Sequence, residues 1–326
     1  MINWDSNDVC DQDLLSPDPE KQAKALQHGK QVSVAFAWWL QHGVPRDDGK
    51  GTGYPDLQIV ASALGSADGL SQFPYVREAR RLKALRTILE RDVATGSSRA
   101  VPFDDSIGIG HYPIDIHACG SAPHLRASKP YQIPLGALLS ASIPNLLAGS
   151  KNIGTTHITN GAYRIHPTEW AIGFAAGFVA ATAVSLRVPL REIALTPSRL
   201  RKLQRDLLVQ GQPLVWFDDV PVNSPYFEGT QFAAILGLIE LRSDSLSLQP
   251  EGVVSGREAA FALGKMVALK PSKVLRNAGD LASLGELEWS SLARFGHGAE
   301  RKHGAVKRGE FAKWLVSLYR LERTAN

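Results

Sequence analysis

Residues 149–169 concentrate side chains that suit ligand binding. The segment reads GSKNIGTTHITNGAYRIHPTE and holds two histidines, several hydroxyls and amides, and three glycines. Hydroxyls, amides and imidazoles donate and accept hydrogen bonds, and glycine lets a backbone approach a ligand closely. A long apolar run follows at residues 170–186. The pattern favours a loop that faces a ligand and leads into a helix, with an ordered connector as the alternative.

A second group of candidate residues lies in DSIGIGHYPIDIH, at residues 105–117. In an extended segment Asp115 and His117 point to the same side, because alternate residues share a face. A carboxylate can orient an imidazole, and an imidazole can transfer a proton near neutral pH. We expect His117 to donate or accept a proton and Asp115 to orient it. A purely structural Asp–His pair is the alternative.

The stretch VREARRLKALRTILERD predicts a helix from Val76 to about Val93. Its apolar residues recur at helical spacing and its charges of both signs alternate, which is typical of a solvated helix face. We expect Arg77 and Arg80 to bind an anionic substrate, with an ordinary helix-surface role as the alternative. The sequence contains no nucleophile elbow, zinc motif or phosphate loop, so we predict no metal site.

Other elements must position these residues. Isoleucines alternate on both sides of Pro113 and predict an extended segment at residues 106–117. A short buried strand is predicted at residues 143–149. Helices are predicted at residues 16–43, with Asp18 as the cap, at residues 167–186, and at residues 198–211.

The composition indicates a soluble globular protein. Of 326 residues, 44% are hydrophobic and 21% are charged, and the formal net charge is +4. This mild excess does not indicate a nucleic-acid partner. The apolar run at residues 170–186 is short for a membrane span and rich in glycine and alanine, so we expect a core helix and no membrane span. The two cysteines, Cys10 and Cys119, are expected to be free thiols.

Several stretches together resemble a known family. PYQIPLGALL (130–139) and IPNLLAGSKNIGTTHITNGAYRIHPTEWAIGFAAGFVAA (143–181) resemble the C-terminal part of bacterial FAD-dependent oxidoreductases of the glutathione-reductase-like flavoprotein class. FPYVREARRL (73–82) and residues 105–117 are similar to upstream parts of that family. The resemblance covers residues 1–211.

The resemblance implies that FAD is the cofactor and that hydride passes between an organic substrate and flavin N5. In such flavoproteins the chain returns to the flavin through this loop, and the following helix points its N-terminus at the cofactor. A helix N-terminus carries unpaired N–H groups and a partial positive charge, which favour negative charge on the reduced flavin. The residues implied to bind FAD are Asn152, Ile153, Thr155, Thr156, His157, Gly161, Ala162, Tyr163, Arg164, His166, Pro167 and Thr168.

The implied fold is α/β or α+β, namely the C-terminal half of a two-dinucleotide-type FAD-binding fold followed by a mostly helical tail. No stretch reads as a strand, Gly-x-Gly-x-x-Gly, a helix and a later acidic residue. That Rossmann unit would hold the adenosine end of FAD. We therefore expect a fragment, a split-gene product or a truncated relative. Its expected partners are a small-molecule substrate and a separate chain that contains the N-terminal Rossmann unit.

The predicted domain boundary lies at residue 211, and residues 212–326 form the tail. WFDDVPVNSPYFEGTQFAAILGLIE (216–240) and LQPEGVVSGREAAFAL (248–263) resemble an S-layer homology module. Residues 254–263 and 306–315 are weakly similar, which predicts two copies of one helical unit.

The resemblance of the tail leaves a second function open. S-layer homology modules often bind cell-wall polysaccharide, usually three modules together. The alternative function is therefore a non-catalytic binding or assembly module, associated with the cell wall through this tail. The compartment stays open as well: cytoplasmic if the tail is only structural, cell-surface or periplasmic if a signal sequence precedes the chain.

Overall fold

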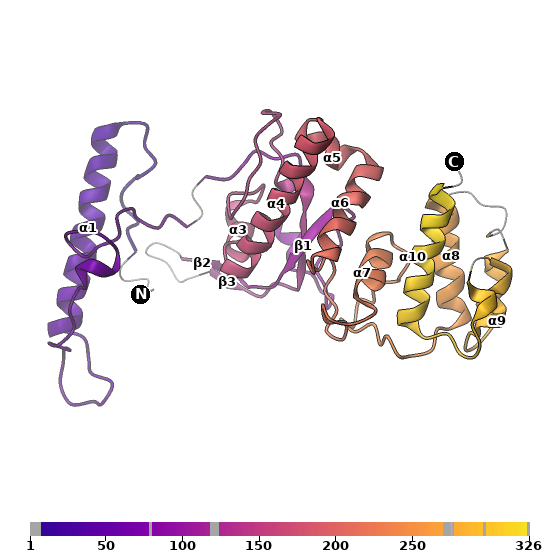
Figure 1. The fold of residues 1–326 in the computed structure, drawn as a ribbon. Coiled ribbons are helices and arrows are strands. Elements are labelled where there is room, and N and C mark those ends of the chain that lie inside the picture. The colour runs from indigo at the N-terminus through magenta and orange to yellow at the C-terminus, as the bar shows by residue number, and fades with distance from the viewer. Residues whose placement is uncertain are drawn as a thin grey trace. The chain divides into compact units, whose positions relative to one another are not determined.

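The computed structural model describes residues 8–77, 80–117, 124–269, 275, 277–295 and 298–324. Their packing divides the chain into two compact units. The first unit comprises residues 1–79 and 115–125, and the second comprises residues 80–114 and 126–326. Figure 1 labels the helices and strands in chain order. This division follows packing alone, and the predicted boundary at residue 211 stays a prediction.

The main element of the first unit is α1, Pro19–His42 (Figure 1). The carboxylate of Asp18 accepts a hydrogen bond from a backbone N–H of the first turn at 2.9 Å, which confirms the predicted helix and its cap. The unit also contains η2, a 3-10 helix at Ala61–Ala63. Its small core is made by buried apolar residues, namely Phe36, Leu40 and Val44.

The expectation of free thiols is wrong for Cys10, which is disulfide-bonded. Cys119 lies outside the described residues. A disulfide restricts the unfolded chain and so stabilises the folded state.

The second unit is built around β1, Ser106–Gly110, which pairs antiparallel with β4, Tyr131–Pro134. A separate two-stranded sheet joins β2, Ile114–Ile116, with β3, His124–Arg126, and most of its residues belong to the first unit. The predicted extended segment and its break at Pro113 are confirmed, because β1 ends before the proline and β2 begins after it. Helices combined with small sheets are consistent with the α/β class.

The helix predicted at residues 76–93 is wrong. Among the described residues of that stretch only α2, Glu90–Val93, is helical. Upstream, the Ile88 N–H donates to the Gly154 carbonyl at 2.8 Å, and the Ile88 side chain is fully buried. The spacing of the apolar residues is compatible with a helix. The backbone groups instead form hydrogen bonds with a distant segment, and this tertiary pairing overrides the local preference for a helix.

The strand predicted at residues 143–149 is also wrong. The segment forms turns, with an isolated bridge between Leu147 and Leu139. Ile143 and Leu146 are 54% and 41% exposed, so part of this apolar run lies outside the core. A short apolar run does not by itself distinguish a buried strand from other structures.

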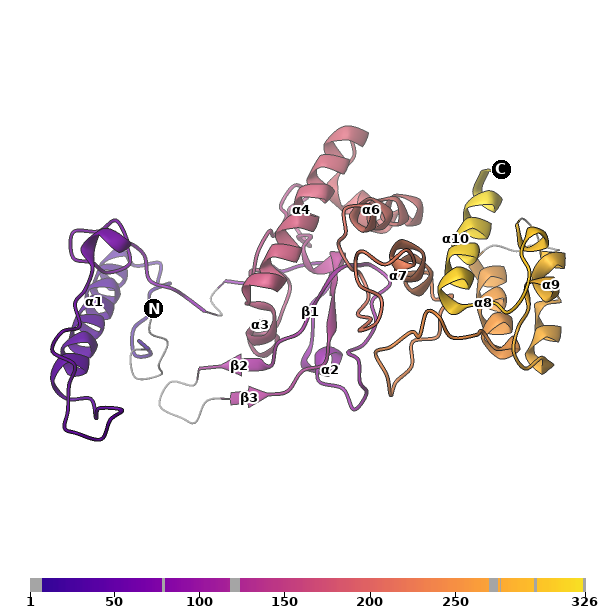
Figure 2. The same ribbon diagram turned by 60° about the horizontal axis from the view of Figure 1, so that its bottom comes forward.

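The predicted helices at residues 167–186 and 198–211 are confirmed as α4, His166–Leu186, and α6, Pro197–Val209. α4 packs against β1, against α6 and against α5, Leu190–Leu195 (Figure 2). Two shorter elements precede α4 in the same unit: η3, Leu135–Ala137, and α3, His157–Tyr163.

The two sides of α4 differ in exposure. Ile172, Ala175 and Val179 are buried in the core, whereas Trp170 and Val184 are 76% and 78% exposed. By length and composition alone α4 is apolar enough to cross a membrane, and 33% of its apolar window is buried inside the structure. One face of α4 therefore belongs to the core as expected, and the other is left open in this chain.

Buried glutamine side chains join the segment after α6 to the rest of the second unit. Gln231 Oε1 accepts hydrogen bonds from the backbone N–H groups of Leu214 and Val215 at 2.9 and 2.7 Å. Its Nε2 donates to the Val215 carbonyl at 2.8 Å. Gln132 Nε2 donates to the Leu214 carbonyl at 2.9 Å. These residues are buried, so the amides replace partners that a regular strand would supply.

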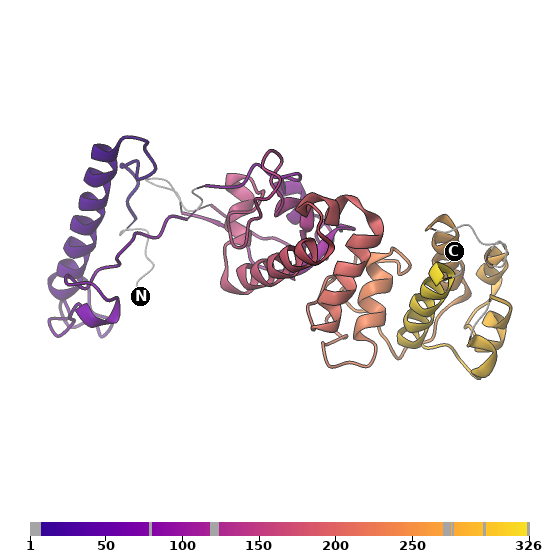
Figure 3. The same cartoon turned by 45° about the horizontal axis from the view of Figure 1, so that its top comes forward.

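The tail is mostly helical (Figure 3). In it α7 packs against α10, and α8 packs against η4. The helices are α7, Phe227–Ile235, α8, Gly256–Leu269, α9, Trp289–Leu292, and α10, Arg308–Thr324. The 3-10 helices are η4, Ala278–Ser283, η5, Ala293–Phe295, and η6, Ala299–Arg301.

Three backbone segments of the tail form a closed ring of hydrogen bonds. The Val254 N–H donates to the Val306 carbonyl, the Val306 N–H to Leu287, and the Leu287 N–H to Val254, each at 2.8 Å. In each case a helix begins two residues later, at α8, α10 and α9 respectively. The two segments that resemble each other in sequence thus hold equivalent positions, and Leu287 marks a third that the sequence comparison missed.

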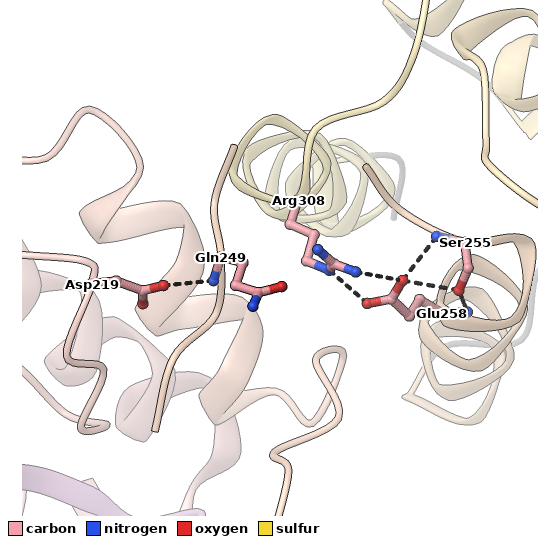
Figure 4. Close-up of polar contacts among 5 residues, drawn as sticks. All are labelled: Asp219, Gln249, Ser255, Glu258 and Arg308. Atoms are coloured by element: carbon pink, nitrogen blue, oxygen red, sulfur yellow. Dashed lines mark hydrogen bonds and ion pairs between the residues drawn. The ribbon is translucent and has the colours of Figure 1, made fainter. Parts of the chain in front are cut away.

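Polar contacts tie α8 to α10 (Figure 4). Glu258 Oε2 accepts hydrogen bonds from the Ser255 N–H and hydroxyl at 2.8 and 2.9 Å, and Arg308 Nε donates to Glu258 Oε1 at 2.7 Å. Burial alone would raise the pKa of Glu258, but the hydrogen bonds from Arg308 and Ser255 hold that pKa below its usual range. Nearby, Asp219 accepts the backbone N–H of Gln249 at 2.7 Å, where Gln249 adopts a φ of 59°.

Replacing Gln231 should destabilise the second unit. Gln231→Ala leaves the buried N–H groups of Leu214 and Val215 without partners, and we expect a loss of about 2–4 kcal/mol in the free energy of unfolding. Urea denaturation followed by circular dichroism measures it. Gln210→Ala is the control, since Gln210 is exposed at the end of α6 and should change stability by less than about 0.5 kcal/mol. Equal losses in both variants would contradict the role of the buried amide.

Candidate functional site

The segment at residues 149–169 contains a helix of its own, α3, before α4 begins. Thr156 caps α3: its hydroxyl accepts the Thr159 N–H at 3.1 Å, and the Thr159 hydroxyl accepts the Thr156 N–H at 2.9 Å. The Thr159 hydroxyl also donates to the Ile88 carbonyl at 2.8 Å. The N-terminus of α3 is thus held by its own side chains, which leaves the ligand-facing role to other groups.

The N-terminus of α4 has no side-chain cap. Its N-cap residue is Ile165, whose apolar side chain offers no acceptor, and Pro167 lies in the first turn. His166 and Pro167 are exposed. The first-turn N–H groups and the positive end of the helix dipole therefore suit an acceptor from a bound ligand.

Asn160 provides a buried acceptor in the same segment. The residue is 1% exposed. Its Nδ2 donates to the Lys151 carbonyl at 2.7 Å and to the Thr155 hydroxyl at 3.1 Å. Its Oδ1 has no hydrogen-bond partner. A buried amide oxygen without a partner is costly, so this position fits a donor group supplied by a ligand. The sequence did not single out Asn160 as a site residue, although Asn160 lies within residues 149–169.

Two stacked tyrosines, Tyr131 and Tyr163, help to hold the backbone of residues 149–169 in place. The rings of Tyr131 and Tyr163 lie 4.3 Å apart between centroids. Tyr131 donates to the Ala162 carbonyl at 2.6 Å, and Tyr163 donates to the Gln132 carbonyl at 2.8 Å. Burial raises the pKa of both hydroxyls well above the ordinary value, so both stay protonated donors. Their role is to position the chain, since neither hydroxyl titrates near neutral pH.

Gly154 lies where no side chain fits. A Cβ on this residue would stand 2.3 Å from the Arg86 carbonyl oxygen and 2.6 Å from the Ala84 side chain. Gly149, at the start of the segment, has nothing within 4 Å of the equivalent position. Of these two glycines, Gly154 is therefore the one at which the loop packs closely against the rest of the second unit.

The predicted FAD-binding residues separate into two groups by exposure. The buried predicted residues pack into the core, and unlike Asn160 Oδ1 none of their side chains is assigned to contact with a ligand: Ile153, Thr155, Gly161, Ala162, Tyr163 and Thr168. The exposed or partly exposed residues are the ones whose side chains can reach a ligand: Asn152, Thr156, His157, Arg164, His166 and Pro167. The structure thus brings the predicted residues into one segment, and their contact with a cofactor stays a prediction.

The predicted catalytic histidine lies in the first unit, next to a residue that sequence reasoning missed. His117 Nδ1 lies 2.7 Å from Asp8 Oδ2. Arg77, predicted to bind substrate, donates to the other oxygen of Asp8 at 2.8 Å. Arg80 is exposed and belongs to the second unit. The structure therefore joins Arg77 with His117 through Asp8. Asp8 and His117 are 109 residues apart in the sequence, so no local pattern could predict their contact.

Metal binding finds no support among the described residues, where no group of three or more His, Cys, Asp or Glu side chains is placed to hold an ion.

Gly154→Ala tests the packing of the loop. We expect a loss of about 1–3 kcal/mol in the free energy of unfolding, because the new methyl group meets backbone and cannot be accommodated without a shift. Thermal denaturation measures the change. Gly149→Ala adds the same group in open space and should be neutral or slightly stabilising. A neutral Gly154→Ala would show that the loop does not pack as closely as described.

A comparison with protein families identifies the region that contains these residues. The model of the FAD dependent oxidoreductase family matches residues 1–207. The whole tail, residues 212–326, lies outside that match, and the comparisons give no support to the S-layer resemblance. No curated protein and no solved structure was found to match the chain. Because the match covers more than half of the 326 residues, the chain belongs to the FAD dependent oxidoreductase family.

Proposed function

We propose that this chain provides the flavin end of an FAD-dependent oxidoreductase that transfers hydride between an organic substrate and flavin N5. The observation that carries the proposal is the segment at residues 149–169. It combines the uncapped N-terminus of α4 with the unpartnered Oδ1 of Asn160, inside the range of the family match.

These groups fit a flavin. An isoalloxazine ring offers both a ring N–H donor and carbonyl acceptors. Asn160 Oδ1 supplies an acceptor for the former, and the first turn of α4 supplies N–H donors for the latter. When bound, FAD would supply the group that accepts or donates the hydride. The role of the α4 N-terminus is to favour negative charge on the reduced ring, which an exposed helix end does by about 0.3–1 kcal/mol.

The other predicted residues take roles consistent with their exposure. We assign cofactor contact to Asn152, Thr156, His157, Arg164 and His166. Backbone N–H donors come from His166 and Thr168, since Pro167 between them has no N–H group. The buried residues Ile153, Thr155, Gly161, Ala162 and Tyr163 hold the backbone in place behind them.

The adenosine end of FAD requires a Rossmann unit. In the part of the chain that the structure describes, each sheet has two strands, which is too small for that unit. We propose that a separate chain with a Rossmann unit supplies it, and that the two chains bind one FAD together.

Substrate chemistry is assigned to the first unit. In the proposal His117 donates or accepts the proton that accompanies hydride transfer. Arg77 and Arg80 attract an anionic substrate, and Asp115 contributes to the polar surroundings of His117. Because Arg77 already pairs with Asp8, part of its charge is compensated before any substrate binds.

A second candidate function belongs to the tail. The closed ring through Val254, Leu287 and Val306 arranges three segments in equivalent positions, which favours a repeat architecture. S-layer homology modules usually act in threes, so this observation supports a binding or assembly module that associates with cell-wall polysaccharide. In that case the matched region is carried by the tail and need not catalyse a reaction.

Flavin titration tests the first proposal. We expect FMN and FAD to bind the full-length chain with similar affinity, because the adenosine contacts lie elsewhere. His166→Asp should weaken binding about two- to fivefold, since a carboxylate at the helix N-terminus competes with the flavin, while it stabilises the helix by about 0.3–1 kcal/mol. Flavin fluorescence measures binding, and thermal denaturation measures stability.

The control for this charge change is Ser185→Asp, at the exposed opposite end of α4. It should leave flavin binding unchanged and slightly destabilise the helix. FAD binding much tighter than FMN binding would contradict the half-site. Absence of flavin binding by this chain both alone and together with a chain that contains the Rossmann unit would remove the proposed role of the segment.

Co-sedimentation with bacterial cell walls tests the second candidate. The full-length chain should sediment with walls that retain their polysaccharide and stay soluble with walls from which it has been stripped. Val306→Pro removes the N–H that bonds to Leu287 and should abolish sedimentation, whereas Val306→Ala keeps that N–H and should retain it. Equal sedimentation with both kinds of wall would exclude polysaccharide recognition.

A further inference from the structure

We propose that Asp8 is the residue that positions His117, and that one carboxylate holds both His117 and Arg77. This inference rests on the proposed function in one respect: it assumes that His117 handles the proton. Its test measures the imidazole directly and does not need a flavin.

The contacts place Asp8 at the centre of the three residues. One carboxylate oxygen lies 2.7 Å from His117 Nδ1, and the other accepts a hydrogen bond from Arg77 Nη1 at 2.8 Å. The side chains of His117 and Asp8 are each 12% exposed, and that of Arg77 is 19% exposed. Short hydrogen bonds between largely buried charged groups fix orientation better than contacts between exposed ones.

The bond between Asp8 and His117 determines the tautomer of the imidazole. Asp8 carries one negative charge and Arg77 one positive charge. An ionised carboxylate is only an acceptor, so His117 must carry its proton on Nδ1 to form the observed bond. The tautomer is thereby fixed, and Nε2 becomes the basic nitrogen of the ring. A group that transfers protons needs this preset orientation, because the lone pair must face the reacting atom.

Asp115 cannot take this role at Nδ1. A ring nitrogen makes one in-plane hydrogen bond, and Asp8 occupies it at 2.7 Å. The sequence pattern places Asp115 on the same side as His117, but the hydrogen-bonding partner comes from a segment 109 residues away. The proposal therefore gives the bond at Nδ1 to Asp8, and the expectation that Asp115 helps to orient His117 stays a prediction.

The test is the tautomer of His117, read from long-range nitrogen–proton correlations in the histidine-labelled full-length chain. A His117→Gln spectrum identifies the signals. At a pH above the titration of the ring, we expect the wild-type imidazole to be protonated at Nδ1. In Asp8→Ala we expect the Nε2-protonated form to predominate, because the acceptor that selects Nδ1–H is gone. Asp8→Glu should restore the wild-type form at least in part.

Asp11→Ala is the matched control. Asp11 also faces a histidine, with 3.3 Å between its Oδ1 and His28 Nε2, but its side chain is 66% exposed. This variant should leave the signals of His117 unchanged. An unchanged His117 tautomer in folded Asp8→Ala overturns the proposal. If Asp8→Ala does not fold, the wild-type spectrum decides, since a neutral ring protonated at Nε2 is incompatible with the bond to Asp8.

The outcome is separable from the proposed function. A tautomer that follows Asp8, together with absence of flavin binding, keeps the positioning role and removes the oxidoreductase proposal. Flavin binding together with an unchanged tautomer in Asp8→Ala keeps the oxidoreductase proposal and removes the positioning role of Asp8.

Discussion

Buried amide side chains hold the second unit together at the point where regular strand pairing ends. The Leu214 carbonyl accepts hydrogen bonds from the Ser106 hydroxyl and from Gln132, and its N–H donates to Gln231. Leaving one such buried group unpaired costs about 1–3 kcal/mol, comparable to a large part of the stability of a domain. The start of the tail and the β1–β4 sheet therefore share one core, although the family match ends at residue 207.

Gln132 connects this core to the candidate site. Its side chain bonds to Leu214, while its backbone carbonyl accepts the hydroxyl of Tyr163 at 2.8 Å. Tyr163 stacks on Tyr131, which in turn bonds to Ala162 just before α4. A chain of buried hydrogen bonds thus runs from the tail to the segment that we assign to the flavin. In a close-packed interior such a chain keeps backbone groups in one arrangement, which a site that binds a rigid ring requires.

Local patterns predict those parts of the fold that depend on local interactions. The cap at Asp18, the long apolar run of α4 and the break at Pro113 are properties of neighbouring residues, and all three are confirmed. The predictions are wrong where contacts with residues distant in the sequence determine the local structure. Residues 80–89 have helical spacing, yet Ile88 pairs with Gly154, and residues 143–149 are apolar without lying in a strand. The contact between Asp8 and His117 is of the same kind, because no pattern relates residues so far apart.

The long-range bonds of Leu214 also bear on how the chain is made. Its partners Ser106 and Gln132 lie 108 and 82 residues earlier in the sequence. A ribosome releases the chain from its N-terminus, at about 5–20 residues per second. The sheet residues therefore emerge several seconds before the segment that completes their hydrogen bonds. During that interval Gln132 Nε2 lacks its acceptor, the Leu214 carbonyl, although Gln132 Oε1 can already accept the backbone N–H of Phe103, which is synthesised earlier. The core of the second unit consequently closes late, after the entire region that defines the family has already been synthesised.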